Sequence, residues 1–350
     1  MNKPIVDKIA AAVLYEGYIL YPYRPSVKNR QRWTFGGVYP QAYSTAQGGA
    51  EPCFMQTQSL LEAGRDSRLE VRIRFLHLVN RQVGKITARV AGGEPEFQEV
   101  ESLQVGSKRF QSWQEAVERE VALAETSLTD LLLQPRRHSF RFPGDRNLEP
   151  IRTPEGDTVA VIVREQQPLE GLMEWRAEAV DQGLYRMTVK ISNETQMDHT
   201  WARDRDRALR HAFVSTHTVL GVENGEFISL MDPGRRQQAA SACVNIGTWP
   251  ILVGEEGVRD TLLSSPIILY DYPQVAPESP GDLFDATEID EILSLRILTL
   301  TDDEKQEAAA TDERARALLE RTESLAREQL MGLHGAIRGL RPVREEVARD

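Results

Sequence analysis

The clearest pattern in the chain is the alternation of apolar and polar residues over 69–79, LEVRIRFLHLV. One face of this segment is apolar, while Glu70, Arg72 and Arg74 fall on the other face. A period of two residues is typical of a half-buried antiparallel strand. Two further pairs of apolar segments are separated by turn residues, Asp181-Gln182-Gly183 in one pair and Asn224-Gly225 in the other, and each pair predicts a hairpin. The pairs are 170–180 with 184–193, and 213–222 with 226–231.

Helices are predicted where the apolar residues recur every three or four positions and a capping sequence precedes them. Ser112 to Glu115 reads as a capping box, in which a hydroxyl and a carboxylate satisfy free amides at a helix start, and we expect this helix to reach Leu132. A second capping box at 301–304 precedes a C-terminal helix over 303–330. Shorter helices are expected at 6–15 and 287–298.

The fold class that these elements predict is α+β. We expect mostly antiparallel sheets, a sandwich-like second half, a capped mid-chain helix and a C-terminal helical segment. Three segments follow from the changes in pattern: an N-terminal α+β module over 1–145, a β-rich module ending in an acidic helix over 146–300, and a C-terminal helix with a mobile tail over 301–350.

Composition restricts the classes of partner. The net charge of −11 argues against non-specific binding to nucleic acid or to anionic lipid, and it leaves a basic protein surface as a possible partner. The two cysteines, Cys53 and Cys243, lie outside any CxxC spacing, so a disulfide framework is not expected. The first 20 residues contain neither a cleavage signal nor an apolar run of spanning length. We therefore expect a cytoplasmic protein without a membrane span.

The familiar short motifs for phosphate, dinucleotide, hydrolase and calcium sites do not occur, so no cofactor is implied. The stretch that stands out is 264–300, which reads as a strand over 267–270, a loop and then a helix. In this stretch two tyrosines precede a run of acidic residues. Its candidate partner-binding residues are Tyr270, Tyr272, Asp282, Asp285, Glu288 and Glu291.

A basic loop near the N-terminus contains Arg30, Arg32 and Trp33. This pattern is typical of a surface loop whose aromatic residues pack inward and whose arginines pair with local carboxylates, and in nucleic-acid binders it contacts phosphates and bases. The loop is also a second candidate contact region, facing either a partner or the acidic helix of this same chain.

The acidic cluster and a second set of His, Asp and Cys residues each have more than one interpretation. Asp285, Glu288 and Glu291 are three residues apart, so on a helix they share a face that suits helix capping, a basic partner, a hard cation or acid–base chemistry. His217, Asp232 and Cys243 are weak candidates for a borderline metal, and His217 with Cys243 for a nucleophile pair, if the fold brings them together. Cys243 alone is typical of a small buried apolar residue.

Several unusual strings resemble an uncharacterised protein family encoded alongside nickel–iron hydrogenases, particularly the high-affinity, oxygen-tolerant enzymes. The strings are VLYEGYILYPYRPSVKNRQRWTFGGVYP (13–40), VSTHTVLGVENGEFISLMDP (214–233), CVNIGTWPILVG (243–254) and SSPIILYDYPQVAPESPGDLFDATEIDEILSLRILTLTDDEK (264–305). The resemblance implies an accessory role in the maturation, assembly or electron-transfer partnering of a hydrogenase, and it assigns no functional residue.

Taken with the missing cofactor motifs, this resemblance leads us to expect a non-catalytic accessory protein that docks a hydrogenase subunit or a maturation factor. Aromatic anchors within a polar rim, as in the 264–300 stretch, are typical of protein interfaces. The alternative is a metal-dependent enzyme or metallochaperone that uses either the carboxylates or the His/Cys set.

Overall fold

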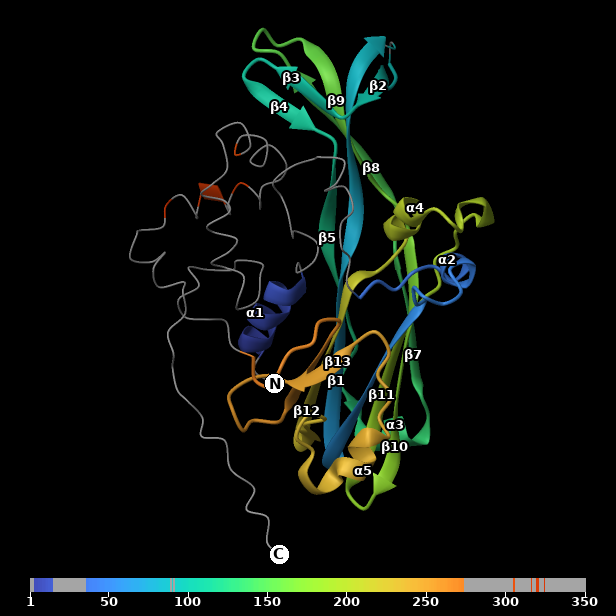
Figure 1. Cartoon of the computed structure of the whole chain (residues 1–350), viewed down its shortest axis with the longest axis vertical. Helices are drawn as coiled ribbons and strands as arrows, with labels where there is room; N and C mark the ends of the chain where they lie inside the picture. Colours follow the sequence, from blue (N-terminus) through green and yellow to red (C-terminus); the bar gives the residue numbers. More distant parts are fainter. Residues whose placement is uncertain are drawn as a thin grey trace, which may run out of the picture.

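The computed structural model describes residues 3–14, 36–88, 90 and 92–273, together with five residues near the C-terminus (305, 316, 319, 320 and 324). The described part is an elongated molecule built on one 12-stranded sheet, with short helices against it (Figure 1). Every strand pairing in this part is antiparallel. The predicted α+β class with mostly antiparallel sheet is therefore confirmed.

The elements follow one another along the chain with short connections. The helices are α1 (Lys3–Leu14), α2 (Gln41–Ala46), α3 (Leu128–Leu133), α4 (Arg205–Arg210) and α5 (Gln237–Ser241), with 3-10 turns η1 (His199–Trp201) and η2 (Gly234–Arg236). The strands are β1 (Phe54–Ala88), β2 (Glu96–Val100), β3 (Ser102–Val105), β4 (Lys108–Gln111), β5 (Trp113–Ala122), β6 (Thr126–Ser127), β7 (Arg136–Phe142), β8 (Asp145–Arg152), β9 (Thr158–Gln166), β10 (Leu169–Asp181), β11 (Leu184–Asn193), β12 (Val214–Ile228), β13 (Trp249–Leu252) and β14 (Thr261–Ser265).

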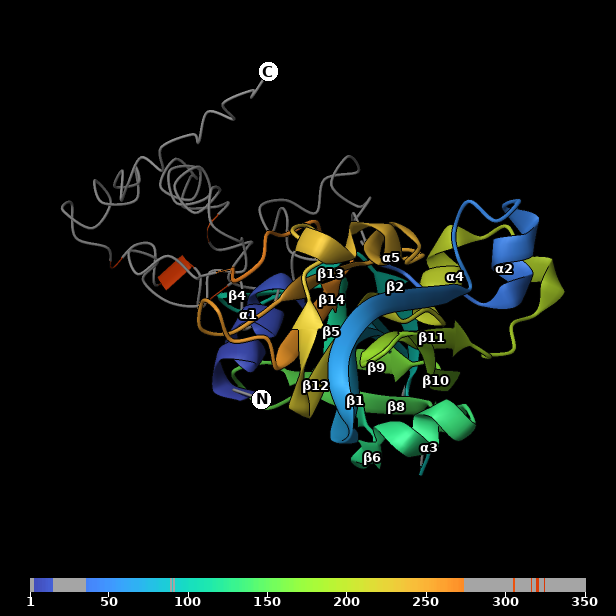
Figure 2. The same cartoon turned by 90° about the horizontal axis from the view of Figure 1, so that it is seen from below.

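The sheet is organised around β1, which is 35 residues long and contains the predicted strand 69–79. Its first part pairs with β11 and β12, its middle with β12 and β5, and its last part with β9 and β2. The register against β12 shifts between Ala63 and Arg68, and β1 is strongly curved in Figure 2. Bulges of this kind bend a strand and increase its twist, so one strand can serve both halves of the molecule.

The alternation along β1 places two apolar cores on its inner face. The larger core surrounds Val71, Ile73 and Phe75 and includes the buried Trp175 of β10. The smaller core surrounds Val83, where the β3–β4 hairpin contributes partly buried residues. Between the two cores the inner face carries polar side chains, and the opposite, outer face carries Arg72 and Arg74.

The two predicted hairpins have different outcomes. β10 and β11 form the expected antiparallel pair, with Asp181 opposite Leu184, so this hairpin is confirmed. The prediction for 213–231 is wrong, because both sides of Asn224-Gly225 belong to the single strand β12 and pair with the same strand, β1. Asn224 does have the positive φ of 57° that such a turn requires, but it adopts it at an irregularity within the ladder.

The predicted mid-chain helix from Ser112 to Leu132 is also wrong over most of its length. Residues 113–122 form β5, which pairs with β1 from Arg72 to Arg81. The Ser112 hydroxyl does not cap a helix; it donates to the Val100 carbonyl and accepts from the Val83 amide. The capped helix of this region is α3, whose N-cap Ser127 accepts from the Asp130 amide. Pairing of β5 along the long β1 strand overrides the local helical pattern.

The remaining predictions concern the end of the chain. The predicted strand 267–270 is wrong, because β14 ends at Ser265. The acidic helix at 287–298 lies outside the described residues, and the C-terminal helix stays a prediction, although the five residues described there are helical. The sandwich-like second half and the three-segment division also stay predictions; strands from both sides of the 145/146 boundary share the large sheet. Among the described residues, no helix has the length and apolar character needed to cross a membrane.

Candidate functional site

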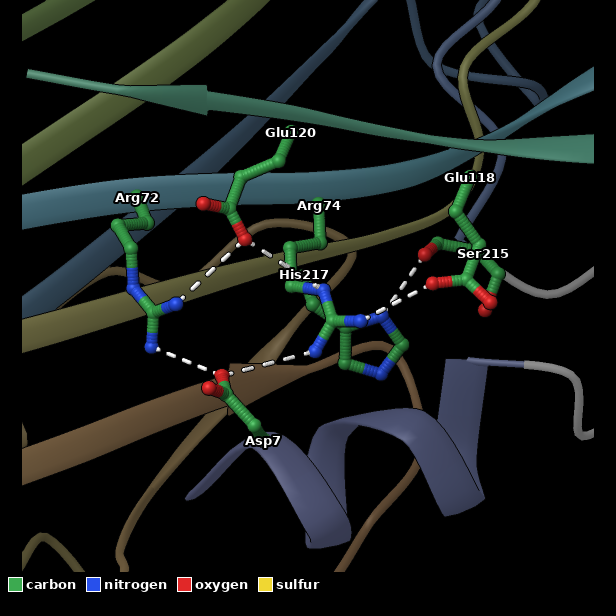
Figure 3. Close-up of polar contacts among 7 residues, drawn as sticks. All are labelled: Asp7, Arg72, Arg74, Glu118, Glu120, Ser215 and His217. Carbon is green, nitrogen blue, oxygen red and sulfur yellow. Dashed lines mark hydrogen bonds and ion pairs between the residues drawn. The ribbon is translucent and has the colours of Figure 1, made fainter. Parts of the chain in front are cut away.

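The outer face of the sheet carries a set of buried charges beneath α1. The apolar side of α1, through Val6, Ile9 and Ala10, packs on a row formed by Val219, Leu263 and Ile251. This packing directs Asp7 of α1 towards Arg72 and Arg74 of β1, as Figure 3 shows. Both arginines therefore lie between the helix and the sheet, with side chains only 11% and 12% exposed.

Each arginine contacts carboxylates from two directions. Arg72 lies 3.0 Å from the Asp7 carboxylate and 3.5 Å from that of Glu120 on β5. Arg74 lies 3.1 Å from Glu118 and 3.8 Å from both Asp7 and Glu120. Buried charges are tolerated when they are paired in this way. The network therefore ties α1 to the outer face of the sheet across the paired strands β1 and β5.

The strand register extends this network into a row that crosses five strands. Arg74 faces Glu120 on β5 and His217 on β12. The His217 ring contacts Ser265 of β14, which in turn faces Trp249 of β13. Cross-strand neighbours lie on the same face of a sheet. We call Glu120, Arg74, His217, Ser265 and Trp249 the transverse row.

His217 is the centre of the transverse row and is fully buried. Its Nδ1 is 2.7 Å from the Ser215 carbonyl and its Nε2 is 3.3 Å from the Ser265 hydroxyl. Since a carbonyl only accepts, Nδ1 donates and Nε2 accepts from Ser265. Burial lowers the pKa of His217 to about 4, with a smaller contribution from the charge of Arg74. The ring is therefore neutral near pH 7.

The backbone at Ser215 is irregular, which is what brings its carbonyl beneath the ring. Ser215 has a φ of 52°, and the register between β1 and β12 shifts between Arg74 and Leu76 at this point. Bulges and positive φ values in residues other than glycine often accompany functional sites. Here the bulge directs a main-chain acceptor to Nδ1 and leaves the Ser215 hydroxyl buried without a hydrogen-bond partner.

A serine beside a histidine is the arrangement that pairs a nucleophile with a base in many enzymes, but the details favour a structural role. The Ser265 hydroxyl also accepts from the Ile267 amide, and both Ser265 and His217 have no exposed surface. A substrate has no access to this pair in the structure. What the arrangement does chemically is satisfy buried polar groups and hold β12, β14 and the chain after Ser265 together.

The three predicted soft-metal ligands are not brought together. His217 lies near the start of β12, whereas Asp232 is exposed after its end. Cys243 packs against the separate cluster around Leu60 and Leu184, and burial raises the pKa of its thiol. Within the part of the chain that the structure describes, no group of three or more His, Cys, Asp or Glu side chains could hold a metal ion.

A second surface of interest follows β14. The chain leaves Ser265 opposite Trp249, and by Asp271 it is bonded to Leu252, so residues 266–270 pass around the Trp249 end of β13. Ile268 and Tyr270 on this loop are 69% and 79% exposed, and Trp249 is 45% exposed. We call Trp249, Ile268 and Tyr270 the apolar loop surface.

The loop that carries this surface is attached to the sheet at both ends. The Asp271 carboxylate accepts from the Leu252 amide and from the Ser229 hydroxyl, and the Tyr272 amide donates to the Leu252 carbonyl. Leu269 and Tyr272 pack against two different apolar clusters. The segment therefore alternates between anchored and exposed side chains.

These bonds also close the outer edge of β13. The Val253 amide donates to Thr261 within the ladder, so Pro250 and Leu252 direct their main-chain groups to the other side. Pro250 has no amide hydrogen, and Leu252 is bonded to residues 271 and 272. Edge strands protected in this way do not accept a further strand. A partner would therefore contact side chains here and not the backbone ladder.

The predicted partner-binding residues divide into two groups. Tyr270 is exposed and Tyr272 is half-buried against the main core. The others lie outside the described residues: Arg30, Arg32, Trp33, Asp282, Asp285, Glu288 and Glu291. Sequence reasoning missed the buried network of Arg72 and Arg74, although two arginines on the polar face of a strongly alternating strand were an available signal.

The comparisons with family models and with curated proteins found no match.

Proposed function

We propose that the protein is a non-catalytic docking protein, and that its partner is a subunit or maturation factor of a nickel–iron hydrogenase. The observation that supports docking is the apolar loop surface, where Ile268 and Tyr270 are exposed on a segment anchored at both ends. The proposal of a hydrogenase partner rests on the resemblance of four long segments of the sequence to a family encoded alongside nickel–iron hydrogenases.

Exposed apolar side chains that are held rigidly are suited to binding. Exposed apolar patches often mark interaction sites, and Ile268 and Tyr270, two residues apart on one loop, are both exposed. Aromatic anchors lose little conformational entropy on binding and account for much of the affinity of protein interfaces. The bonds from Asp271 and Tyr272 to Leu252 fix the loop before any partner arrives, which reduces the ordering cost further.

The docking surface is tested by truncating its side chains one at a time. Tyr270→Ala and Ile268→Ala are each expected to weaken capture of the partner, with Tyr270→Ala costing about 2 kcal/mol, or roughly 30-fold in affinity, if it is a central anchor. The matched control is Leu133→Ala, because Leu133 is 78% exposed at the end of α3 and outside this surface. Equal binding by all three variants and the wild type would refute the assignment.

The identity of the partner is tested separately, by affinity purification of the tagged full chain from its native host. We expect a hydrogenase subunit or maturation factor to co-purify with the wild type and to be depleted with Tyr270→Ala. Elemental analysis of the same sample distinguishes a docking protein from a metallochaperone. Stoichiometric metal in the purified chain without a co-purifying protein would favour the metallochaperone and overturn the proposal.

A further inference from the structure

A group of buried polar atoms without partners lies on the inner face of the sheet, between the two apolar cores. His77 of β1 and Gln166 of β9 are 0% and 9% exposed, and His77 Nδ1 and Gln166 Nε2 have no hydrogen-bond partner. The Nε of Arg119 on β5 is likewise buried without one. Buried polar atoms in folded proteins are nearly always satisfied, so each exception calls for an explanation such as an ordered water or an ion.

Two of the three side chains, Arg119 and His77, contact the ring of Phe142, and the third, Gln166, bonds to Arg119. The Arg119 guanidinium carbon is 4.9 Å from the centre of this ring, and the His77 ring centre is 6.5 Å from it. Gln166 joins the group through its Oε1, which accepts from Arg119 Nη2 at 3.0 Å. Three strands and the Phe142 ring of β7 thus place the unpartnered atoms in one region.

The donor and acceptor roles of these atoms are fixed by the bonds already made. His77 Nε2 is 2.7 Å from the Gln167 carbonyl, so it donates, and Nδ1 is left as an acceptor. Gln166 Nε2 and Arg119 Nε are donors. The region therefore offers two free donors and one free acceptor.

The charge in this region is positive. Among the described residues Arg119 forms no ion pair; its contacts are the Gln166 amide and the Phe142 ring. Burial, with smaller contributions from the charges of Arg119 and of the nearby His211, lowers the pKa of His77 to about 4. A guanidinium that has a buried Nε and no carboxylate partner favours an anion over a water molecule.

We propose that His77, Arg119 and Gln166 form a binding site for a small oxyanion that carries one hydroxyl group, such as hydrogen phosphate or bicarbonate. Two oxygens of the ligand accept from Arg119 Nε and Gln166 Nε2, and its hydroxyl donates to His77 Nδ1. Sulfate has no hydroxyl near neutral pH, so it leaves the His77 acceptor unpaired. The site is therefore selective for a protonated oxyanion over sulfate.

The test follows the Arg119 Nε–H signal by NMR while the full chain is titrated with phosphate, bicarbonate, sulfate or chloride at constant ionic strength. We expect a saturable change of this signal with phosphate or bicarbonate, and binding of sulfate that is about tenfold weaker. Calorimetry on Arg119→Met should show loss of phosphate binding. Arg137→Gln is the matched control, because it removes an equal charge from the exposed edge strand β7 and should bind phosphate like the wild type.

The outcomes are distinguishable. No saturable change with phosphate or bicarbonate means that ordered water satisfies these atoms, and the proposal is then wrong. Equal responses to phosphate, sulfate and chloride, matched by the exposed Arg137 signal, indicate an adventitious ion only and also overturn it. If Arg119→Met does not fold, Gln166→Leu replaces it as the deciding variant. Retained phosphate affinity in Gln166→Leu would then count against the site.

Discussion

Replacement of Arg74 by methionine tests whether the buried charge network stabilises the fold. The Arg74 side chain is 12% exposed and lies 3.1 Å from Glu118. Methionine keeps an unbranched apolar stem of similar length, so the substitution removes the charge with little change in packing. What remains is a set of three carboxylates with a single cation, Arg72, among them.

The expected magnitude follows from how buried each partner is. Removing one member of a fully buried ion pair costs about 3–5 kcal/mol. Asp7, Glu118 and Glu120 are 37–46% exposed, so water stabilises them in part once the arginine is gone. Arg74 Nη1 is also buried without a hydrogen-bond partner, and its removal gains a little. We therefore expect a loss of about 2 kcal/mol in the free energy of unfolding.

The assay is urea unfolding of Arg74→Met beside Arg68→Met. Arg68 is the matched control, because it lies on β1 like Arg74 and pairs with a carboxylate, that of Glu125 at 3.3 Å. Its side chain, however, is 60% exposed. Exposed pairs contribute roughly 0–1 kcal/mol, so the control should unfold close to the wild type. Equal stability of the two variants would refute the reasoning, and so would an Arg74→Met variant more stable than the wild type.

Three further changes test the packing, the histidine and the loop. Gly171→Ala should cost about 1–3 kcal/mol in thermal unfolding, because an added Cβ would overlap the Phe140 ring. The pKa of His217 is lowered to about 4 in the folded chain, so the unfolded chain binds a proton that the folded chain does not. Stability should be complete above about pH 6.5 and fall towards pH 4, and His217 should account for up to about 2 kcal/mol of the loss at pH 5. His77, whose pKa is also lowered to about 4, adds to the same loss. Urea unfolding above about pH 6.5 and at about pH 5 should therefore show a smaller loss in His217→Gln than in the wild type. Ser265→Ala removes the acceptor for the Ile267 amide and should speed hydrogen exchange at that amide, as followed by NMR; unchanged exchange would show that this bond does not hold the loop.

The parts of the fold that sequence reasoning predicted correctly are those where local pattern and tertiary structure agree. Segment 69–79 alternates because one face of β1 is covered by the core, and the turn at 181–183 joins two strands that pair with each other. The segment 113–122 shows the opposite case. Its valines at 117 and 121 have helical spacing, but pairing with β1 along ten residues outweighs that local preference.

The candidate sites were less accessible to sequence reasoning, because they depend on register. Nothing local indicates that Arg74, His217 and Ser265 lie side by side, since they come from three strands far apart in the chain. The same applies to His77, Arg119 and Gln166. Within the predicted contact region Tyr270 is exposed, whereas Tyr272, two residues later, packs against the core. The predicted set of His217, Asp232 and Cys243 failed for the same reason, because residue type alone does not place side chains in space.

The transverse row adds to the rigidity that the bonds from Asp271 and Tyr272 to Leu252 give the apolar loop surface. Trp249 is both the last member of the row and part of that surface, and it faces Ser265 across the β13–β14 ladder. The Ser265 hydroxyl links the buried His217 to the amide of Ile267, one residue before the exposed Ile268. A side chain on a loop whose backbone is already fixed by buried hydrogen bonds loses less conformational freedom on binding. The buried network and the exposed surface are therefore one structural unit, in which the first positions the second.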